Sequence, residues 1–433
     1  MRKLLRQIVL SVLTFEARMV LARGKPKIFV VTGSVGKTST KDAVYSGLST
    51  SFDVRKSEKS YNSEIGVPLT ILNLKNAWDS PIFWLLNIFK GFWELIKPGI
   101  YPTHLVLEVG ADKPGDLKEI FSWLIPDVVV VTRLPKIPVH VEFYDSPEQL
   151  MEEESIPAFK IKKGGVLVLN RDDENVFSLT KEARGEVVTF GLDKLSDVSG
   201  GNILVSYRNG ARGKRPIGIT FRVDNNGSSV PVDLEGTLGI QNVYHVLSAF
   251  AVGIKEGINL VRLSESFKNY SSPPGRMKII EGVFDTTIID DTYNSSPVAL
   301  EEALSTLKSI ESKERKIAVL GDMLELGKFS ESEHERIGRV VLGSAHILIT
   351  VGARAKGIGK AALESGMDKS KIFEFGESKE AGKFIKGILE EGDFVLVKGS
   401  QGMRMERIVE EIILHPELKE KLLVRQEKEW QER

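Results

Sequence analysis

Short apolar runs alternate with longer amphipathic stretches along most of this chain. The runs at 27–32, 104–111, 127–134 and 164–170 are rich in Val, Leu and Ile. Runs of this length, separated by stretches with helical spacing, are typical of a mostly parallel sheet covered by helices on both faces. The more polar, Gly- and Ser-rich stretch at 192–235 interrupts the series, and we expect it to add antiparallel strands.

A segment rich in Pro and Gly, SSPPGRM at 271–277, separates this series from a second one. Paired prolines and a glycine stop a helix and mark a linker. Five more apolar runs follow it: TTIIDDTY, KIAVLGDM, HILITVG, KIFEFG and DFVLVKGS. The sequence therefore predicts an α/β protein, with a central domain at 26–272 and a C-terminal Rossmann-like domain at 273–433.

The composition narrows the classes of function. At 433 residues the chain is too long for one compact core. Lys plus Arg equals Asp plus Glu, 59 of each, so we predict no nucleic-acid partner. The chain has no cysteine, which excludes disulfides, thiolate metal sites and cysteine nucleophiles.

Residues 1–25 are predicted to form a short basic amphipathic helix. Through residue 27 the segment holds seven basic residues and one acidic residue. Its apolar run at 8–15 is too short to cross a membrane, and no signal-peptide cleavage site follows. Such a helix lies either on an anionic membrane surface or against the next domain.

The segment 79–99, DSPIFWLLNIFKGFWELIKPG, is apolar on most sides of a helix. We expect it to be buried in the core or between domains. Contact with a membrane or a partner is the alternative, which Trp84 and Trp93 would suit. The polar residues fall on a narrow stripe: Asn87, Lys90, Glu94 and Lys97.

The strongest local motif is VVTGSVGKTST at 30–40. A strand ends there, two glycines permit tight turns, and a helix begins near Lys37, so backbone N–H groups can surround a phosphate. Lys37 would reach the β- and γ-phosphates and Thr38 would bind Mg²⁺. A chance Lys-Thr pair after a glycine turn is the alternative. The predicted nucleotide-binding residues are Gly33, Ser34, Val35, Gly36, Lys37, Thr38 and Ser39.

Polar residues end several other predicted strands. Glu108 closes LVLEVGA and could hold Mg²⁺, directly or through water. His140 follows another strand, although a lone histidine is more often structural. In the second series, Asp290 and Asp291 close one strand, and Lys398, Ser400 and Arg404 lie at or just after the end of another. Because the carboxyl ends of parallel strands share one edge, these groups suit an anionic ligand there.

Together these motifs resemble those of the Mur ligases. The matching stretches are TGSVGKTST, YNSEIGVPLT, LEVGADKPGDL, LVLNRDDE, PPGRMKII, IIDDTYNSSP, AVLGDMLELG and VLVKGSQGMRMERI. They run from about residue 28 to 412. The C-terminal motifs are most similar to those of the member that joins D-alanyl-D-alanine to a UDP-muramoyl-tripeptide.

The resemblance implies an ATP- and Mg²⁺-dependent ligase that forms an acyl phosphate, which an amine then attacks. It assigns metal ligands to Thr38, Glu108 and His140. It places Asn242 at the adenine, Arg276 at the γ-phosphate and Asp291 at the ribose. The residues expected near the substrates are Asn62, Asn294, Lys398, Ser400 and Arg404.

Three departures from the family pattern matter. Only about 30 residues precede the phosphate loop, so we expect the UDP part of the acceptor to be held differently, by a partner or through a membrane-linked acceptor. Gln241 replaces the usual histidine before Asn242. Relatives carry a carbamylated lysine as a metal ligand in the helix after His140. Alignment places Glu154 there, whereas a one-residue shift would instead place Glu153. Otherwise Glu152 and Glu153 are both assigned to a solvated helix face.

The leading hypothesis is a cytoplasmic ligase of peptidoglycan precursor synthesis, with 1–25 and 79–99 as candidate contacts with the inner face of the plasma membrane. Glu154 joins Lys37, Glu108, His140 and Arg276 in the predicted catalytic set. Two alternatives stay open. One is a related ligase acting on a polyglutamate or lipid-linked muropeptide acceptor. The other is a nucleotide-binding scaffold without turnover.

Overall fold

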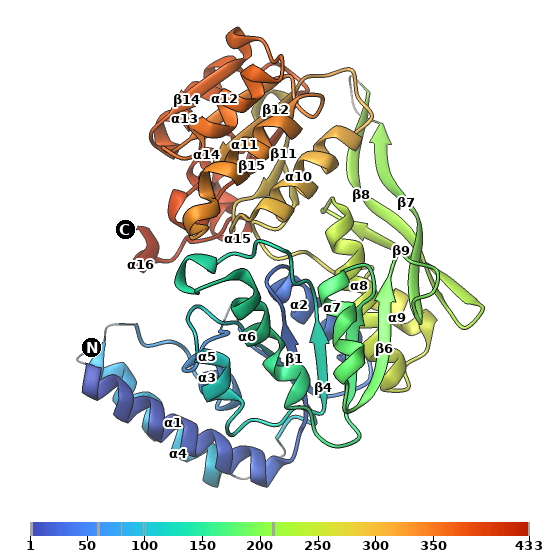
Figure 1. The fold of residues 1–433 in the computed structure, drawn as a ribbon, viewed down its shortest axis with the longest axis vertical. Coiled ribbons are helices and arrows are strands. Elements are labelled where there is room, and N and C mark those ends of the chain that lie inside the picture. The colour runs from blue at the N-terminus through green and yellow to red at the C-terminus, as the bar shows by residue number, and fades with distance from the viewer. Residues whose placement is uncertain are drawn as a thin grey trace.

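The computed structural model describes residues 3–58, 61–78, 80–97, 99, 101–209 and 213–431. Two open sheets follow one another along the chain, each with helices on both faces, and they stack end to end (Figure 1). The predicted α/β class is confirmed. Residues 1, 2, 79 and 98, which belong to the two segments singled out above, lie outside the described residues.

The first sheet has nine strands in the order β2-β3-β1-β4-β5-β6-β7-β8-β9. The strands from β1 to β6 are parallel, whereas β7, β8 and β9 form an antiparallel extension at one edge, as predicted for 192–235. The bounds are β1 Lys27–Thr32, β2 Val54–Lys56, β3 His104–Glu108, β4 Val128–Val131, β5 Val166–Asn170, β6 Glu186–Gly191, β7 Val198–Asn209, β8 Lys214–Asn225 and β9 Ser228–Glu235.

Alternate side chains of the central strands enter two different cores. In β1, Phe29 and Val31 pack toward α2 and α8, whereas Ile28 and Val30 pack on the opposite face. A strand buried on both faces has to be apolar throughout, which is why these strands read as continuous apolar runs. The helices are α1 Lys3–Gly24, α2 Lys37–Leu48, α3 Gly66–Ile71, α4 Pro81–Ile96, α5 Asp116–Ile120, α6 Pro147–Phe159, α7 Glu174–Ser178, α8 Ile240–Lys255 and α9 Leu260–Ser266.

Helix α1 is part of the first unit's core. Its inner side chains, Val9, Leu13, Ala17 and Val20, are at most 3% exposed and belong to the same apolar cluster as Ile28. Packing against the next domain, one of the two alternatives for this segment, is therefore confirmed for one side of the helix.

Helix α4 buries a different side from the one expected. Its buried residues are Trp84, Asn87, Gly91 and Glu94, so Asn87 and Glu94 of the polar stripe face the protein, whereas Lys90 is exposed. The expectation that its apolar side is buried is wrong, because Asn87 and Glu94 find polar partners inside. No helix in the described ranges is long and apolar enough to cross a membrane.

The second sheet has the order β10-β11-β15-β12-β13-β14 and is parallel except for β10, an antiparallel edge strand that was not predicted. Its strands are β10 Lys278–Glu281, β11 Thr287–Asp291, β12 Lys316–Gly321, β13 Ile347–Val351, β14 Ile372–Phe375 and β15 Phe394–Lys398. Its helices are α10 Pro297–Ser309, α11 Ser330–Val341, α12 Lys356–Glu364, α13 Ser378–Ile388, α14 Glu406–Ile412, α15 Lys419–Leu422 and α16 Lys428–Gln431.

Candidate active site

A cavity of about 1400 Å³ lies between the two sheets. The carboxyl ends of β1 and β3 reach it from one side, and those of β11 and β15 from the other. Ligands of open α/β sheets bind at this edge. Most of the predicted site residues line it: Ser34, Val35, Gly36, Lys37, Thr38, Ser39, Asn62, Glu108, His140, Asn242, Arg276, Asp291, Asn294 and Lys398.

The loop between β1 and α2 depends on glycine at two positions. Gly33 has φ 120° and Gly36 has φ 85°. A Cβ atom on Gly33 would lie 2.4 Å from Thr132 Oγ1, and one on Gly36 would lie 2.8 Å from His245 Nε2. The loop therefore lies directly against its neighbours. Helix α2 begins at Lys37, so the unbonded N–H groups of its first turn stand at the cavity.

Glu154 reaches this loop from α6. Its side chain accepts a short hydrogen bond from Ser34 Oγ, and its Oε1 lies 3.8 Å from Lys37 Nζ. The lysine also donates to Gly33 O at 2.6 Å. Glu154 is 1% exposed, and burial raises the pKa of its carboxyl, opposed by Lys37, Ser34 and His140. The structure thus brings together the loop and the predicted carboxylate.

The two neighbouring glutamates lie elsewhere. Glu152 is exposed, as predicted. Glu153 is not simply solvated, because its Oε1 accepts the N–H groups of Leu117 at 2.9 Å and Lys118 at 3.3 Å, in the first turn of α5. A carboxylate at a helix N-terminus is stabilised by these N–H groups. The solvent assignment of Glu153 is corrected, and its side chain turns toward α5 rather than the phosphate loop.

Thr38 and Glu108 form the pair of cavity residues best suited to bind a metal ion. Thr38 Oγ1 donates to Glu108 Oε1 at 3.0 Å, and Glu108 Oε2 has no hydrogen-bond partner, with Lys41 Nζ 3.6 Å away. A carboxylate and a hydroxyl are hard oxygen ligands, and Mg²⁺ keeps several waters when such groups hold it. The pair therefore fits a magnesium ion bound partly through water.

His140 lies at the boundary between the two units. Its Nδ1 is 2.5 Å from Glu325 Oε2, on the loop after β12, and its Nε2 is 3.8 Å from Asp112 Oδ1. The hydrogen bond from His140 lowers the pKa of the Glu325 carboxyl. His140 also has a left-handed backbone, with φ 72°. Its side chain thus connects the first unit to the second.

The four predicted metal ligands do not form one ready-made cage. Within the part of the chain that the structure describes, no three His, Asp or Glu side chains are grouped closely enough to hold a metal ion. Thr38 and Glu108 lie together, Glu154 contacts the loop, and His140 contacts Glu325. A cation there would use part of this set together with water and phosphate oxygens.

Arg276 enters the cavity from the segment between the two sheets. Its guanidinium lies 3.9 Å from the centre of the Tyr293 ring, and its Nε has no hydrogen-bond partner. A planar guanidinium with an unused donor, stacked on an aromatic ring, suits a phosphate group. This position agrees with a role toward the nucleotide.

Asn242 is already engaged in hydrogen bonds. Its Nδ2 donates to Thr237 Oγ1 at 3.0 Å and to Leu238 O at 2.7 Å, and its Oδ1 accepts from Ser272 Oγ at 3.3 Å. The neighbouring Gln241 Oε1 has no hydrogen-bond partner. The residue that departs from the family pattern is therefore the one with an unused acceptor at the cavity.

Asp291 and Lys398 face each other across two neighbouring strands. Lys398 Nζ lies 2.6 Å from Asp291 Oδ2 and donates to Asn294 O at 2.9 Å. Asp291 Oδ1 accepts from Met277 N at 3.2 Å. This group also ties the linker to the second sheet.

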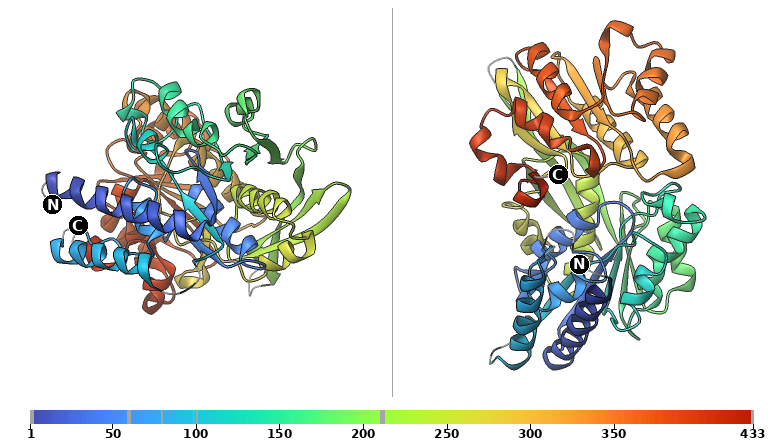
Figure 2. Two further views of the ribbon diagram at one scale, coloured as in Figure 1. Left: turned by 90° about the horizontal axis from the view of Figure 1, so that it is seen from below. Right: turned by 90° about the vertical axis from the view of Figure 1, so that its left-hand side faces the viewer.

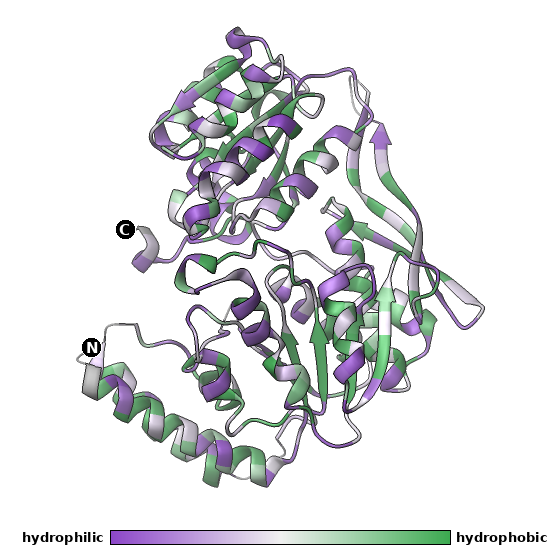
Figure 3. Cartoon of the chain, viewed as in Figure 1, coloured by the Kyte–Doolittle hydropathy of each residue, from purple (hydrophilic) through white to green (hydrophobic). Residues whose placement is uncertain are grey.

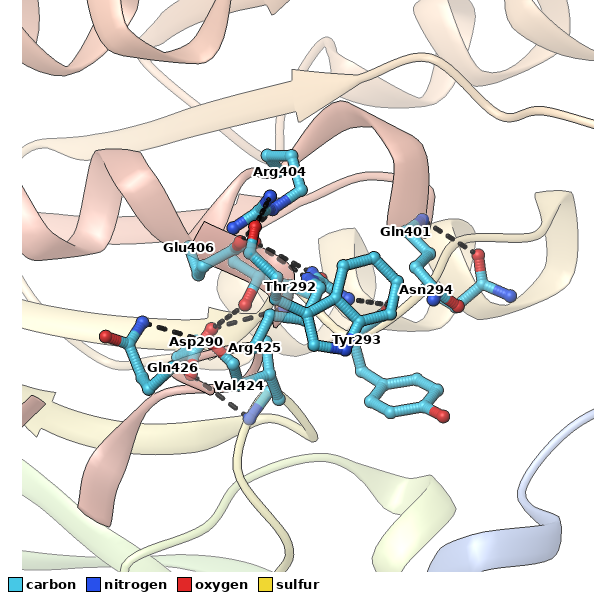
Figure 4. Close-up of polar contacts among 12 residues, drawn as sticks. Asp290, Thr292, Tyr293, Asn294, Gln401, Arg404, Glu406, Val424, Arg425 and Gln426 are labelled. Atoms are coloured by element: carbon cyan, nitrogen blue, oxygen red, sulfur yellow. Dashed lines mark hydrogen bonds and ion pairs between the residues drawn. The ribbon is translucent and has the colours of Figure 1, made fainter. Parts of the chain in front are cut away.

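Ser400 and Arg404 lie outside the cavity lining. Ser400 Oγ accepts from Leu324 N at 2.8 Å. Arg404 donates to Glu406 Oε1 and to Trp430 O, both at 2.6 Å. Both side chains support the loops around the cavity instead of facing it, and Figure 4 shows Arg404 turned toward Glu406.

Arg425 was not recognised in the sequence. It is buried and donates to Glu406 Oε2 and to the carbonyl oxygens of Thr292 and Tyr293, which fixes the loop after β11 (Figure 4). Its neighbours in the C-terminal segment line the cavity, including Trp430. No motif marks this residue. Its left-handed backbone, with φ 58°, is visible only in the structure.

His245 was given no role from the sequence, yet it lies under the phosphate loop. It lines the cavity on α8, and a Cβ atom on Gly36 would meet its ring. Burial, together with Arg276, lowers its pKa to about 3. A neutral ring fits this position, because it adds no charge beside a loop that suits phosphate.

Comparisons with known proteins agree with this geometry. The family model of the Mur ligase middle domain matches residues 31–83 and 99–253, and that of the Mur ligase, glutamate ligase domain, matches 275–401. UDP-N-acetylmuramoyl-tripeptide–D-alanyl-D-alanine ligase of Bacillus subtilis is 27% identical over 90% of this chain and 76% of its own length. The ligase of that name from Mycobacterium tuberculosis strain H37Rv is 27% identical over 91% of this chain and 74% of its own.

Solved structures share the fold. MurF of Thermotoga maritima, in complex with ADP, superposes with a TM-score of 0.73 at 24% identity, over 95% of this chain and 84% of that one. MurF of Acinetobacter baumannii gives a TM-score of 0.74 at 23% identity, over 93% and 79%. The chain belongs to the Mur ligase family of ATP- and Mg²⁺-dependent ligases.

Proposed function

We propose that this ligase adds D-alanyl-D-alanine to a UDP-muramoyl-tripeptide. The observation that carries the proposal is one cavity between the proposed domains 26–272 and 273–433. The cavity has a phosphate loop on one side and the Asp291–Lys398 pair on the other. The named relatives, similar over about nine-tenths of the chain, support this choice of substrates.

A carboxylate and an amine need activation to form an amide. The acceptor carboxylate oxygen attacks the γ-phosphorus of ATP, the bond to the bridging oxygen breaks, and ADP leaves. The neutral amine of the dipeptide then attacks the carbonyl carbon of the acyl phosphate, and phosphate leaves as the amine proton is released. ADP, phosphate, a proton and the amide are the products. Both steps need stabilised negative charge more than a protein nucleophile.

The loop side holds the phosphates in this proposal. Lys37 and the N–H groups at the start of α2 bind the β- and γ-phosphates, and Arg276 reaches them from the linker. Thr38 and Glu108 would hold Mg²⁺, which would supply positive charge to neutralise the phosphates.

We assign Glu154 the carboxylate that similar ligases build on a carbamylated lysine. Support comes from its burial and its contacts with Ser34 and Lys37, which fix it beside the loop. His140, which also lines the cavity, completes the proposed set. Because it also contacts Glu325, its position depends on how closely the two units approach.

The substrates occupy the remaining wall. Asn62, Asn294 and Lys398 line the cavity and can bind carboxylate and amide groups of the acceptor and the dipeptide. Ser400 and Arg404 act as positioning residues, because their hydrogen bonds hold the surrounding loops.

We also propose that the protein works in the cytoplasm, where ATP is available.

Phosphate release from substrate pairs tests the assignment. With ATP and Mg²⁺, release should require both the UDP-muramoyl-tripeptide and D-alanyl-D-alanine. Release with a polyglutamate or a lipid-linked muropeptide instead would contradict the substrate assignment but leave the assignment as a ligase intact. If the chain binds ADP but releases phosphate with none of the pairs, the proposal that it catalyses this reaction is wrong.

A further inference from the structure

Helices α1 and α4 form an outer layer on the first unit. They run parallel and side by side, as both views of Figure 2 show. Arg23 near the end of α1 donates to Lys97 O at 3.4 Å, just past the end of α4. In the middle, the Glu16 carboxylate packs against Gly91, where a Cβ atom would come within 2.1 Å of it. The two helices therefore present one continuous outer surface.

The outward side of α4 is apolar along its whole length. Its large side chains are 43–72% exposed: Ile82, Phe83, Leu85, Leu86, Phe89, Phe92, Trp93 and Ile96. Figure 3 shows apolar residues along both helices at the lower edge of the molecule. A helix on a protein surface ordinarily turns such a side inward, and apolar patches of this extent mark interaction sites.

Specific inner contacts hold α4 in this orientation. Asn87 Nδ2 donates to Lys75 O at 2.8 Å, and Arg55 Nη2 lies 3.5 Å from Glu94 Oε1. The indole of Trp84 donates to Trp78 O at 2.9 Å. Turning the apolar side inward would break all three interactions and bury groups without partners. The outward apolar side is therefore built into the fold.

Helix α1 extends the same surface. Ile8, Phe15 and Met19 point outward and are 47–61% exposed, on the side opposite the buried Val9 and Leu13. We call the outward side chains of the two helices, from Ile8 to Met19 and from Ile82 to Ile96, the α1–α4 face.

The exposed charges of the two helices themselves are all basic. They are Arg6, Arg18, Arg23 and Lys90, of which Arg6 is paired with Glu64 at 2.8 Å. Among the described residues of α1 and α4, both acids, Glu16 and Glu94, are buried at 4% and 7% exposure. The whole chain carries equal numbers of basic and acidic residues, so the positive surface is local. It complements an anionic partner.

These observations select one kind of partner. Pairing of the face with a second copy would bring like charges together. Helix α4 has 16 residues, about 24 Å, and so lies along a bilayer surface more readily than across it. Aromatic and aliphatic side chains flanked by bases suit the boundary of lipid headgroups and chains. We propose that the α1–α4 face docks on an anionic lipid bilayer.

Docking would place the cavity close to the lipid. Asn76 and Trp78, in the segment just before α4, line the cavity. Trp78 also accepts the Trp84 hydrogen bond that orients α4. Only a few residues of the chain thus separate the helix that would contact the bilayer from one wall of the cavity. The proposal stands on the surface itself and does not depend on the choice of substrates.

Co-sedimentation with vesicles tests this proposal. The full chain should bind vesicles of equal parts phosphatidylglycerol and phosphatidylcholine, and bind pure phosphatidylcholine more weakly. The triple variant Phe83→Gln, Phe89→Gln and Trp93→Gln should lose about tenfold or more of this binding. The matched control is Leu195→Gln, Leu204→Gln and Val261→Gln, which changes side chains of similar exposure elsewhere and should bind like the wild type.

Two further measurements separate the other outcomes. Arg18→Glu with Lys90→Glu keeps the apolar side and should reduce binding to the anionic vesicles only. Brominated lipid should quench wild-type fluorescence more than that of Trp93→Phe. Thermal unfolding and ADP binding confirm that the variants fold. Equal binding by both triple variants, or no vesicle binding by the wild type, overturns the proposal. A dimer that only the face variant dissociates would assign the face to a second copy.

Discussion

The two walls of the cavity differ in how many of their polar atoms already have partners. On the loop wall, formed by residues 33–39, Glu108, Gln241 and Arg276, the atoms Glu108 Oε2, Gln241 Oε1 and Arg276 Nε lack hydrogen-bond partners. On the strand wall, formed by Asp291, Asn294, Ser295 and Lys398, Asp291 and Lys398 are paired with each other, and Ser295 Oγ is the exception. Asp290 and Arg404, which support this wall from outside the cavity lining, are paired as well.

This difference separates binding from support. A ligand atom can complete the loop wall, whereas at the strand wall it has to displace a partner that is already there. Substitutions in the loop wall should therefore change turnover with little effect on stability. Substitutions in the strand wall should change stability first.

The largest expected effect is that of Lys37→Ala. Loss of the cation at the phosphates should lower phosphate release by about 10³-fold, or about 4 kcal/mol, as expected for a group that stabilises transferred charge. Unfolding should shift little. Lys163→Ala, an exposed lysine outside the cavity, is the control. Unchanged phosphate release would remove the loop wall from catalysis.

Glu406→Gln should show the opposite pattern. Glu406 is fully buried between Arg404 and Arg425, and its loss leaves the buried Arg425 and the partly buried Arg404 without their carboxylate. We expect about 3 kcal/mol lower stability in denaturant unfolding. The exposed Glu417→Gln is the control. A loss below about 1 kcal/mol would show that the strand wall is not held by this network.

Glu154→Ala should lower turnover by about 10²-fold, because it removes a carboxylate fixed at the loop. If Glu154 replaces a carbamylated lysine, Glu154→Lys should regain activity when bicarbonate is added. The control is Glu152→Ala: Glu152 lies two residues earlier on the same helix and is exposed, so this variant should behave like the wild type. A fully active Glu154→Ala enzyme would make this glutamate structural.

The smallest effect concerns Asp290 and pH. Burial raises its pKa to about 6 in the folded protein, from an ordinary value of 3.8. The folded state therefore holds the proton more tightly, and this group's stabilisation is full below pH 4 and lost as pH rises through 6. Asp290→Asn should flatten the stability curve between pH 4 and 6 by on the order of 1–2 kcal/mol. Parallel curves for the two proteins would contradict this.

The loop wall was largely predictable because its chemistry is contiguous in sequence. Residues 30–40 carry the strand end, the two glycines and the helix start together. Glu108 follows from the rule that ligands meet the carboxyl ends of parallel strands. The strand wall was less predictable, because Arg425 reaches Glu406 and Tyr293 from a distant segment that no periodicity or motif marks.

The orientation of α4 could not be read from its pattern. The spacing of Asn87, Lys90, Glu94 and Lys97 defines a stripe, but a stripe does not say which side is buried. That depends on Lys75 O and Arg55, which meet Asn87 and Glu94 only in the folded chain. The same limit applies to Glu153, whose contact with α5 depends on how two helices meet.

Helix α1 belongs at once to the core, through Val9 and Leu13, and to the α1–α4 face, through Phe15 and Met19. A lipid surface that binds only the folded protein shifts the folding equilibrium toward the folded state. Anionic vesicles should therefore raise the melting temperature of the first unit, and a core substitution such as Leu13→Ala should weaken vesicle binding without touching lipid. Membrane binding and folding would then be thermodynamically coupled, so that a change in one changes the other.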